Sequence, residues 1–313
     1  MEDNNEILKI IKEIGKDDSI EIIDINDTFK FKCQQCGKCC MHRHDIIVNP
    51  FDIYNGAKYL GITTEEFVTK YLDTQLGAES KIPILLLKSN NAGFCPFLEF
   101  DSKNGCKFKC AINEAKPGAC ANHPIGVIRQ YENSKTDTTE EDFIFIKVEQ
   151  CDNSKSDEDV LVKDWVQPYI DNAKEIKAAQ DLQTYITRVF PVHDFFKLSK
   201  FVLSYNVIDK CNDKITDTKE KLYETLKSVI SNTIEYVYVN YDINKPFLEQ
   251  VEENKKILKD FYELIKGLFN VMKESYGIKE GDSIDDFIEN NKDMLFQYEA
   301  EDNVEGEDTN VNN

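Results

Sequence analysis

The sequence predicts an α+β protein, in which a small cysteine-rich domain of short strands and helices is followed by an all-helical C-terminal region. Nine of the ten cysteines lie between Cys33 and Cys151, among short apolar runs and alternating segments. From Val160 onward the apolar residues recur at helical spacing, and Cys211 is the only cysteine that remains. This change of period separates the two regions.

The N-terminal elements are marked by their period and by residues typical of helix ends. Residues 6–15 predict a short amphipathic helix, and residues 20–31 alternate like a strand. Asn49 is typical of an N-cap, with proline at the next position, and Gly61 is typical of the residue that ends a helix. We therefore expect a helix over 50–60.

The middle of the domain carries one more helix signal and three strand signals. Residues 63–66, Thr-Thr-Glu-Glu, form a capping box that starts a second short helix. Residues 82–87 form an apolar run of strand length. Strands are also expected at 125–131 and 143–148, joined by a polar loop.

The C-terminal region carries two stripes of apolar side chains at helical spacing, which we expect to pack as the core between helices. One stripe consists of Leu222, Leu226, Val229, Thr233 and Val237. The other lies between Pro246 and Gly277 and consists of Phe247, Val251, Leu258, Phe261, Ile265, Leu268 and Met272.

The charge distribution argues against nonspecific binding to nucleic acid or to an anionic membrane, because the chain carries a net charge of −20. Residues 33–131 hold 11 Lys and Arg against 9 Asp and Glu, a net +2, which leaves −22 for the remainder. The cysteine-rich segment is therefore locally cationic. Nearby lysines such as Lys38, Lys107 and Lys109 can offset the negative charge of thiolates.

The compartment expected from the sequence is the cytoplasm. No run of 18 or more apolar residues occurs, and the N-terminal residues are acidic where a secretory signal would be basic and then apolar. Cysteines in a reducing compartment are more often metal ligands than disulfide partners.

The most informative motif is Cys33-Gln-Gln-Cys36-Gly-Lys-Cys39-Cys40. Two-residue spacing lets consecutive thiolates converge on one centre from a tight loop, and Gly37 permits the backbone conformation that such a turn often needs. Many iron–sulfur proteins present three cysteines to one cluster in this way. We therefore expect ligation of a metal or of a cluster.

Five further cysteines follow at looser spacing: Cys95, Cys106, Cys110, Cys120 and Cys151. A single tetrahedral zinc ion needs only four ligands, so the number of cysteines favours two four-ligand sites or one polynuclear centre. Cys211 lies in a helical segment and is expected to be a small buried side chain.

The pattern resembles the YkgJ-type cysteine cluster family, which is described as zinc- or iron-chelating and has a C-x2-C-x2-C-C signature. The segment 47–53 is similar to the family's short strand and following helix, Cys95-Pro-Phe-Leu to its C-x-F-L element, and residues 110–124 to its next cysteine element. Asn113, Lys116 and Ala121 stand where that element usually has Tyr, Arg and Arg.

The resemblance implies eight ligands, and Cys106 is a ninth candidate because it lies four residues before Cys110. The expected metal ligands are thus Cys33, Cys36, Cys39, Cys40, Cys95, Cys106, Cys110, Cys120 and Cys151. His42, His44 and His123 follow cysteines and are candidate ligands or hydrogen-bond donors to ligands.

The expected cofactor is an iron–sulfur cluster of the four-iron type or zinc, since thiolates suit both. Adjacent cysteines on an extended backbone point in different directions, and on that premise Cys39 and Cys40 favour a cluster or two centres over one mononuclear ion. The expected domains are 1–32, an N-terminal helix and strand; 33–167, the cysteine-cluster metal-binding domain; 168–298, the helical region; and 299–313, an acidic disordered tail.

Three functions follow from these features. The first is a metal-binding protein whose centre stabilises the fold or transfers electrons, with the helical region offering a surface to an unknown protein partner. The second is a protein lysine N-methylase, because flagellin lysine N-methylases carry a similar cysteine cluster in a longer chain. The third is metal storage or delivery. The chain contains no G-x-G-x-x-G after a strand, no P-loop, no G-x-S-x-G and no H-E-x-x-H motif.

Overall fold

The computed structural model describes residues 20–78, 80–102, 105, 107–129, 143–148, 156–204 and 213–291. The predicted helix at 6–15, the predicted loop at 132–142, the predicted tail and the residues Cys106, Cys151 and Cys211 lie outside the described residues. The chain divides into two compact units, of which the first comprises 1–75, 84–183 and 237–254 and the second comprises 76–83, 184–236 and 255–313.

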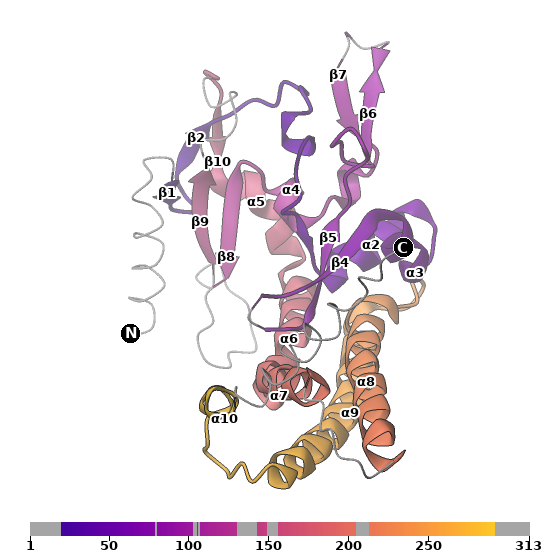
Figure 1. The fold of residues 1–313 in the computed structure, drawn as a ribbon. Coiled ribbons are helices and arrows are strands. Elements are labelled where there is room, and N and C mark those ends of the chain that lie inside the picture. The colour runs from indigo at the N-terminus through magenta and orange to yellow at the C-terminus, as the bar shows by residue number, and fades with distance from the viewer. Residues whose placement is uncertain are drawn as a thin grey trace, which may run out of the picture. The chain divides into compact units, whose positions relative to one another are not determined.

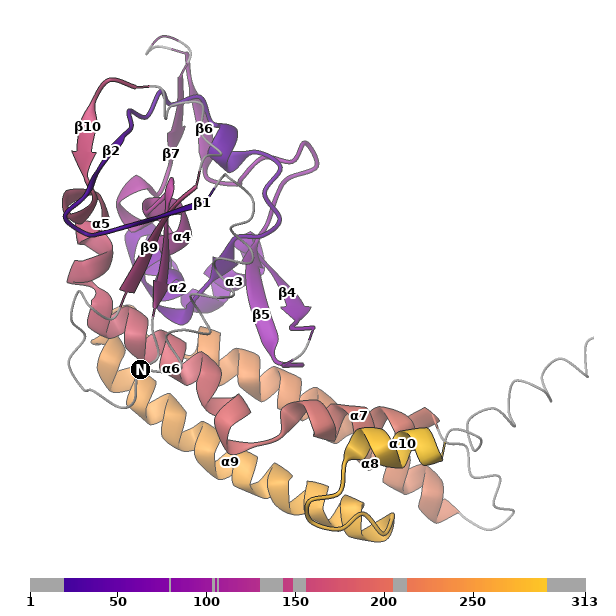
Figure 2. The same ribbon diagram turned by 90° about the vertical axis from the view of Figure 1, so that its left-hand side faces the viewer.

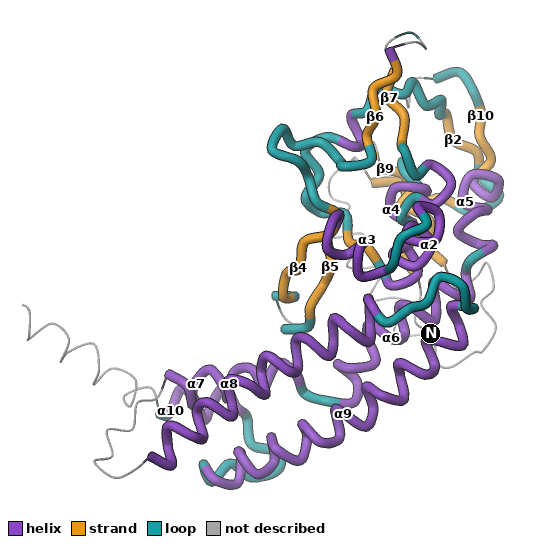
Figure 3. Tube along the Cα trace, turned by 90° about the vertical axis from the view of Figure 1, so that its right-hand side faces the viewer, coloured by secondary structure: helices purple, strands orange, loops and turns teal. Residues whose placement is uncertain are grey.

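The elements in chain order are β1 (Ile20–Ile23), β2 (Thr28–Lys30), η1 (Lys38–Cys40), β3 (Ile47–Val48), α2 (Pro50–Leu60), α3 (Thr64–Tyr71), β4 (Leu72–Leu76), β5 (Pro83–Leu87), β6 (Leu98–Asp101), β7 (Lys107–Cys110), η3 (Asn113–Ala115), α4 (Gly118–Ala121), β8 (Ile125–Arg129), β9 (Phe143–Val148), β10 (Asp159–Leu161), α5 (Val162–Asp171), α6 (Ala173–Val189), α7 (Val192–Ser204), α8 (Asp213–Ile234), η6 (Glu235–Val239), α9 (Phe247–Ser275) and α10 (Ile284–Asn290). Short strands precede long helices along the chain (Figure 3). The predicted α+β class is confirmed.

Four small sheets are formed by the described strands, with the orders β1-β9-β8, β10-β2, β3-β5-β4 and β6-β7 (Figure 1). The antiparallel pairing of β8 with β9 confirms the two strands predicted at 125–131 and 143–148. The prediction of a single strand over 20–31 is wrong, because this segment forms two strands, β1 and β2, that lie in different sheets. Asp24 and Asp27 side chains bind backbone N–H groups of a turn between them, which competes with strand pairing.

The caps predicted for α2 and α3 are confirmed. The Asn49 side chain accepts a hydrogen bond of 2.9 Å from the Asp52 N–H, and Asp52 accepts one of 3.1 Å from the Asn49 N–H. Gly61 ends α2 in the left-handed conformation, with φ of 66°. Thr63 and Glu66 make the same reciprocal pair at the start of α3. Local sequence alone therefore specifies both helices.

The core of the first unit lies where α2, α3 and β5 meet. The side chains of Ile53, Phe67 and Leu85 are fully buried. A Cβ atom at Gly56 would lie 2.6 Å from the Phe67 ring, so α2 and α3 approach too closely there for any side chain. This core supports the chain segments that carry the cysteines.

The segment 237–254 belongs to the first unit although it joins two helices of the C-terminal region. Thr64 Oγ1 donates a hydrogen bond to the Val239 carbonyl, and Tyr54 donates one of 2.8 Å to the Lys245 carbonyl. The Phe247 ring lies 5.3 Å from the Tyr54 ring, centroid to centroid. Side chains of α2 and α3 thus bind the start of α9 and the turn before it.

The second unit is helical, and its core is aromatic. The Phe190 ring packs against Phe195, Tyr262 and Phe269 at centroid distances of 5.4, 5.7 and 6.0 Å. Tyr262 and Phe269 lie on α9, the long helix labelled in Figure 2. No described helix combines the length and the apolar composition needed to cross a membrane.

The predicted apolar stripes are confirmed at most positions but not at the end of α9. Val229, Thr233 and Leu258 are buried as expected, whereas Leu268 is 47% exposed. Phe269 is buried in its place. The sequence offered apolar residues on two adjacent faces of the helix, and packing against α7 and its preceding turn selected one of them.

We expect Ser199→Ala to raise the free energy of unfolding by about 1 kcal/mol, because its buried hydroxyl has no hydrogen-bond partner among the described residues. Thr233 is the matched control, since its buried hydroxyl binds the Val229 carbonyl and lies 2.6 Å from the Tyr262 hydroxyl. Thr233→Val should lower the same quantity by about 1–3 kcal/mol. Urea unfolding monitored by circular dichroism measures both, and equal signs for the two substitutions would contradict this account.

Candidate metal centre

The motif of four cysteines ends in a tight turn. Gly37 has φ of +75° and precedes the 3₁₀ turn η1, in which the Cys40 N–H donates a hydrogen bond of 2.8 Å to the Gly37 carbonyl. The Sγ atoms of Cys39 and Cys40 lie 3.8 Å apart. The premise that these adjacent cysteines lie on extended backbone is therefore wrong, because the turn brings both thiols to the same side.

Backbone hydrogen bonds join this turn to two distant segments. The Cys95 N–H donates a bond of 2.9 Å to the Cys40 carbonyl, and the Phe108 N–H donates one of 2.8 Å to the Gln35 carbonyl. Phe108 lies on β7, which ends at Cys110. The motif is thus held between the two segments that carry the next cysteines described.

Cys95 and Cys110 are brought together by the β6–β7 hairpin. The Leu98 N–H donates a hydrogen bond of 3.1 Å to the Cys95 carbonyl, and Leu98 is paired with Cys110 across the two strands. The cross-strand register therefore sets the relative position of these two cysteines, although they are fifteen residues apart in the sequence.

Cys120 lies in the short helix α4, which is anchored at both ends. The Gly118 N–H at its start donates a hydrogen bond of 3.0 Å to Asp52 Oδ1. The Trp165 indole N–H donates one of 2.9 Å to the Asn122 carbonyl just after its end. Asp52 therefore helps to position Cys120. The sequence marks Asp52 only as a residue of the predicted helix 50–60, because its burial depends on residues distant in the chain.

Five thiols lie close enough to change one another's ionisation by charge–charge interaction. They are Cys39, Cys40, Cys95, Cys110 and Cys120. Burial is the largest cause that raises the pKa of Cys95 and of Cys110. Burial also raises the pKa of Cys120 to about 12, with the charges of Cys95 and Asp52 adding to it. The five cysteines come from four separate chain segments.

Cys39 differs from the other four thiols because its pKa is lowered to about 6. The main cause is a hydrogen bond from the Cys40 thiol, which correspondingly raises the pKa of Cys40, and the charges of Lys116 and Arg43 contribute. Arg43 also binds both oxygens of Asp45, at 2.6 and 2.8 Å. The sequence singles out Lys116 as a departure from the family pattern, but nothing in the pattern singles out Arg43, which lies three residues after the motif.

The other four predicted ligands are not assigned to this group. Cys33 and Cys36 are exposed, and Cys106 and Cys151 lie outside the described residues. Within the described part of the chain, no three His, Cys, Asp or Glu side chains are arranged as a group that could hold a metal ion. The structure thus gathers five of the nine predicted ligands into one region without placing three of them around a common point.

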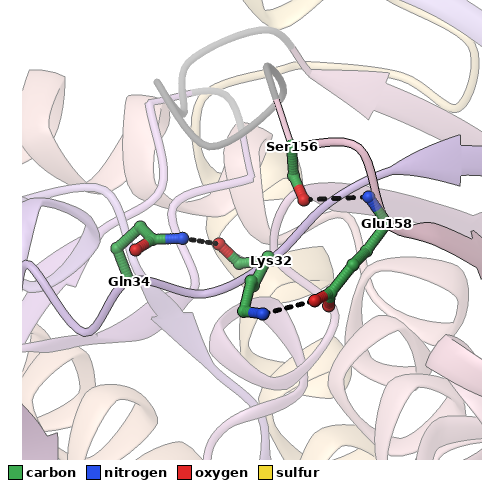
Figure 4. Close-up of polar contacts among 4 residues, drawn as sticks. All are labelled: Lys32, Gln34, Ser156 and Glu158. Atoms are coloured by element: carbon green, nitrogen blue, oxygen red, sulfur yellow. Dashed lines mark hydrogen bonds and ion pairs between the residues drawn. The ribbon is translucent and has the colours of Figure 1, made fainter.

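Figure 4 shows how the chain is held just before Cys33. The Lys32 ammonium group pairs with the Glu158 carboxylate, and the Gln34 side chain donates a hydrogen bond of 3.3 Å to the Lys32 carbonyl. The Phe31 N–H donates one of 3.1 Å to the Glu158 carbonyl, next to the β2–β10 pairing. The ion pair is more than half exposed and contributes little, so the backbone pairing sets the position.

The three candidate histidines are not equivalent. The side chains of His42 and His44 are exposed. The backbone N–H of His42 donates a hydrogen bond of 2.6 Å to the Gly93 carbonyl. His123 is half-buried, and burial together with the charge of Arg43 lowers its pKa. His123 is therefore neutral over a wider pH range, and the neutral imidazole is the form that can bind a metal ion.

The donor set fits a thiophilic metal ion or an iron–sulfur cluster. Thiolate sulfur suits zinc, copper(I) and iron–sulfur clusters, and it disfavours magnesium and calcium. Four of the five gathered thiols have raised pKa values, so a metal ion that binds thiolates would supply the positive charge that their ionisation needs.

Residues 32–155 match the CxxCxxCC family model, whose description reads "Putative zinc- or iron-chelating domain". The family resemblance noted in the sequence is confirmed by this match, which spans all seven described cysteines and leaves the helical region outside it. No curated protein and no solved structure matches the chain.

We expect Gly37→Ala to lower the amount of metal bound per chain. A Cβ atom there would lie 3.0 Å from both Met41 Cε and the Phe108 ring, in addition to the strain of φ +75°. Gly61→Ala is the matched control, because φ is +66° but no atom lies within 4 Å. It should cost about 1 kcal/mol of stability and leave the bound metal unchanged. Elemental analysis of both proteins tests this, and unchanged metal in Gly37→Ala would contradict it.

Asp52 should impose a pH dependence on stability that Asp52→Asn lacks. Burial raises the pKa of Asp52 from 3.8 to about 6, against hydrogen bonds from Asn49 and Gly118 that lower it. The folded state therefore binds the proton more tightly than the unfolded state does. The free energy of unfolding of the wild type should fall relative to that of the variant as the pH rises from 4 to 6, by about 3 kcal/mol at most.

Urea unfolding of the two proteins at each pH measures this difference, and contributions that they share cancel. The lost acceptor in Asp52→Asn adds an offset that does not depend on pH. Asp45→Asn serves as a control of opposite sign, since the hydrogen bonds and charge of Arg43 lower the pKa of the exposed Asp45. A pH-independent difference between wild type and Asp52→Asn would contradict the assignment.

Proposed function

We propose that the CxxCxxCC domain holds a thiolate-ligated zinc or iron centre in which Cys39 and Cys40 bind the same metal ion, and that this centre stabilises the fold of the first unit. The observation that carries the proposal is the separation of 3.8 Å between the two sulfur atoms. Cys95, Cys110 and Cys120 are the further ligands proposed, because their thiols lie in the same charge-coupled group.

The sulfur separation supports a shared ion on geometric grounds. In a tetrahedral zinc site with metal–sulfur distances of about 2.3 Å, neighbouring sulfur atoms lie about 3.8 Å apart. Cys39 and Cys40 already have this separation. The hydrogen bond from the Cys40 thiol lowers the pKa of Cys39 and so favours its thiolate, and a metal ion would replace the proton that the pair shares.

The stabilising role is supported by how little else joins the segments that carry the ligands. The cysteines come from the η1 turn, the chain before β6, the end of β7 and the four-residue helix α4. The hairpin of β6 and β7 is two-stranded, and its Phe100 side chain is 57% exposed. Isolated two-stranded hairpins are marginal in water, so a metal ion that joins these segments would contribute much of their stability.

An iron–sulfur cluster is the second candidate, and a specific observation favours it. Five thiols share the region, and a mononuclear tetrahedral ion uses only four ligands. A cluster could take its ligands from among all five cysteines, and it would add electron transfer to the stabilising role. No described residue favours the lysine methylase or the metal-storage function over these two.

The surrounding charges suit either centre. Arg43 and Lys116 interact favourably with the Cys39 thiolate, and Lys116 also favours the thiolate of Cys110. Several thiolates around one divalent ion leave excess negative charge, which such cations offset. The net charge of +2 over 33–131 is therefore consistent with a thiolate centre in an otherwise acidic chain.

Metal and sulfide analysis after anaerobic purification tests the proposal. We expect zinc or iron bound to the wild type, and Cys39→Ser, Cys40→Ser and Cys120→Ser should each lose most of it. Cys211→Ser is the matched control, because Cys211 lies outside the matched domain, and it should keep the metal. Iron with acid-labile sulfide and visible absorption selects the cluster, whereas metal without sulfide selects the shared ion.

The stabilising role has its own measurement. Removal of the metal by a chelator should lower the near-ultraviolet circular dichroism and the midpoint of thermal unfolding of the full chain. If the metal-free protein keeps both values, the stabilising role is wrong. If Cys40→Ser binds as much metal as the wild type, the shared Cys39–Cys40 ion is wrong.

A further inference from the structure

A stripe of apolar side chains runs along α9 in the second unit and is left exposed by the described residues. Ile257, Leu264, Leu268 and Val271 are 41, 63, 47 and 61% exposed, and Phe261 between them is half-buried. Successive members are separated by four, three, four and three residues. This is the spacing of a seam that packs against a second helix, and we name these five residues the α9 seam.

The α9 seam is distinct from the face that α9 buries in its own unit. Leu258, Tyr262, Ile265 and Phe269 are all at most 3% exposed, and they form the neighbouring face of the helix. The buried core of the unit therefore uses this neighbouring face, and only Phe261 of the seam is partly covered. Single exposed apolar residues are common on protein surfaces, but a continuous row of them marks an interaction site.

Gly267 is a second observation at the same place. It lies in the interior of α9, and a Cβ atom added there would meet no atom of the described residues within 4 Å. Glycine in a helix interior lowers stability by about 0.5–1 kcal/mol relative to alanine. No described neighbour within the unit explains why this position lacks a side chain. Gly267 lies beside Leu264 and Val271, where a closely approaching helix would need the space.

The charges beside the seam indicate what kind of helix fits. Asp260 and Glu274 are exposed and lie on the same edge as Gly267, each seven residues from it. The lysines at 259, 266 and 273 lie on the opposite face of the helix. Lys256 lies on this edge too, four residues before Asp260, and Glu263 lies beside it, three residues after Asp260. The edge that a partner would meet therefore carries three acidic side chains and one basic one, and it is acidic in sum.

A second copy of the chain is a poor occupant on these grounds. It would bring one acidic edge against another, and each chain carries a net charge of −20. Basic residues beside an apolar seam would instead complement Asp260 and Glu274.

We propose that the α9 seam binds an amphipathic α-helix of another protein, whose apolar residues have heptad spacing and whose flanking positions are lysine or arginine. The partner helix packs on Phe261, Leu264 and Leu268, approaches closely at Gly267 and places its basic residues against Asp260 and Glu274. This interface is independent of the metal centre, since every residue that forms it lies outside the CxxCxxCC match.

The probe is a pair of synthetic peptides about three heptads long, with leucine and isoleucine at the two apolar positions of each heptad. One peptide carries lysine at the flanking positions and the other carries glutamate. Binding to the full metal-loaded chain is measured by fluorescence anisotropy. We expect the lysine peptide to bind and the glutamate peptide to bind at least tenfold more weakly, with the difference reduced by added salt.

Two variants assign the binding to the α9 seam. Leu264→Glu combined with Leu268→Glu should weaken binding of the lysine peptide at least tenfold, and Leu248→Glu, at an exposed apolar position of α9 outside the seam, should not. Asp260→Lys combined with Glu274→Lys should reverse the preference between the peptides. All positions are exposed, so the variants should fold, which circular dichroism checks.

The proposal is overturned by any of three results. They are the absence of binding to the lysine peptide, equal binding of both peptides, and binding that survives the Leu264→Glu and Leu268→Glu changes. Sedimentation of the full chain gives a further decisive result, because a dimer that the same two changes dissociate would make a second copy the occupant.

Discussion

The first unit depends on one constraint, which is that several cysteine thiols from distant segments share a small, partly buried region. Burial raises the pKa of Cys95, Cys110 and Cys120, and each thiolate that forms there disfavours its neighbours. Such an arrangement is unfavourable for ionised thiols alone. A bound metal ion would reverse the sign of both effects, and Cys39, whose thiolate is stabilised by the Cys40 thiol, is the natural first ligand.

The rest of the unit positions the segments that carry these thiols. Short hydrogen-bonded links join the Cys40 turn to Cys95 and join Gln35 to β7, and Asp52 joins the core helix α2 to the helix that carries Cys120. Each link uses backbone groups or one buried carboxylate. The cysteine segments are thus attached to one another and to the α2–α3 core by a few hydrogen bonds.

The second unit is held together by apolar and aromatic packing between helices. Its aromatic core packs one face of α9, and the adjacent face remains apolar and exposed. A helix that carries two apolar faces can satisfy its own fold with one and bind a partner with the other.

The sequence by itself determined the helix caps, the α+β class and the cysteine pattern of the family, because capping, period and spacing are local properties. Tertiary structure alone decided that Cys39 and Cys40 face the same side, since the left-handed Gly37 turn replaces extended backbone there. It also decided the burial of Asp52, the place of Arg43 near Cys39, and which apolar face of α9 is core. The burial of Asp52 and the choice of the α9 face depend on contacts between residues far apart in the chain, which no local pattern encodes. The Cys39–Cys40 turn and the place of Arg43 are close in sequence, but the residue pattern does not specify which backbone conformation this segment adopts.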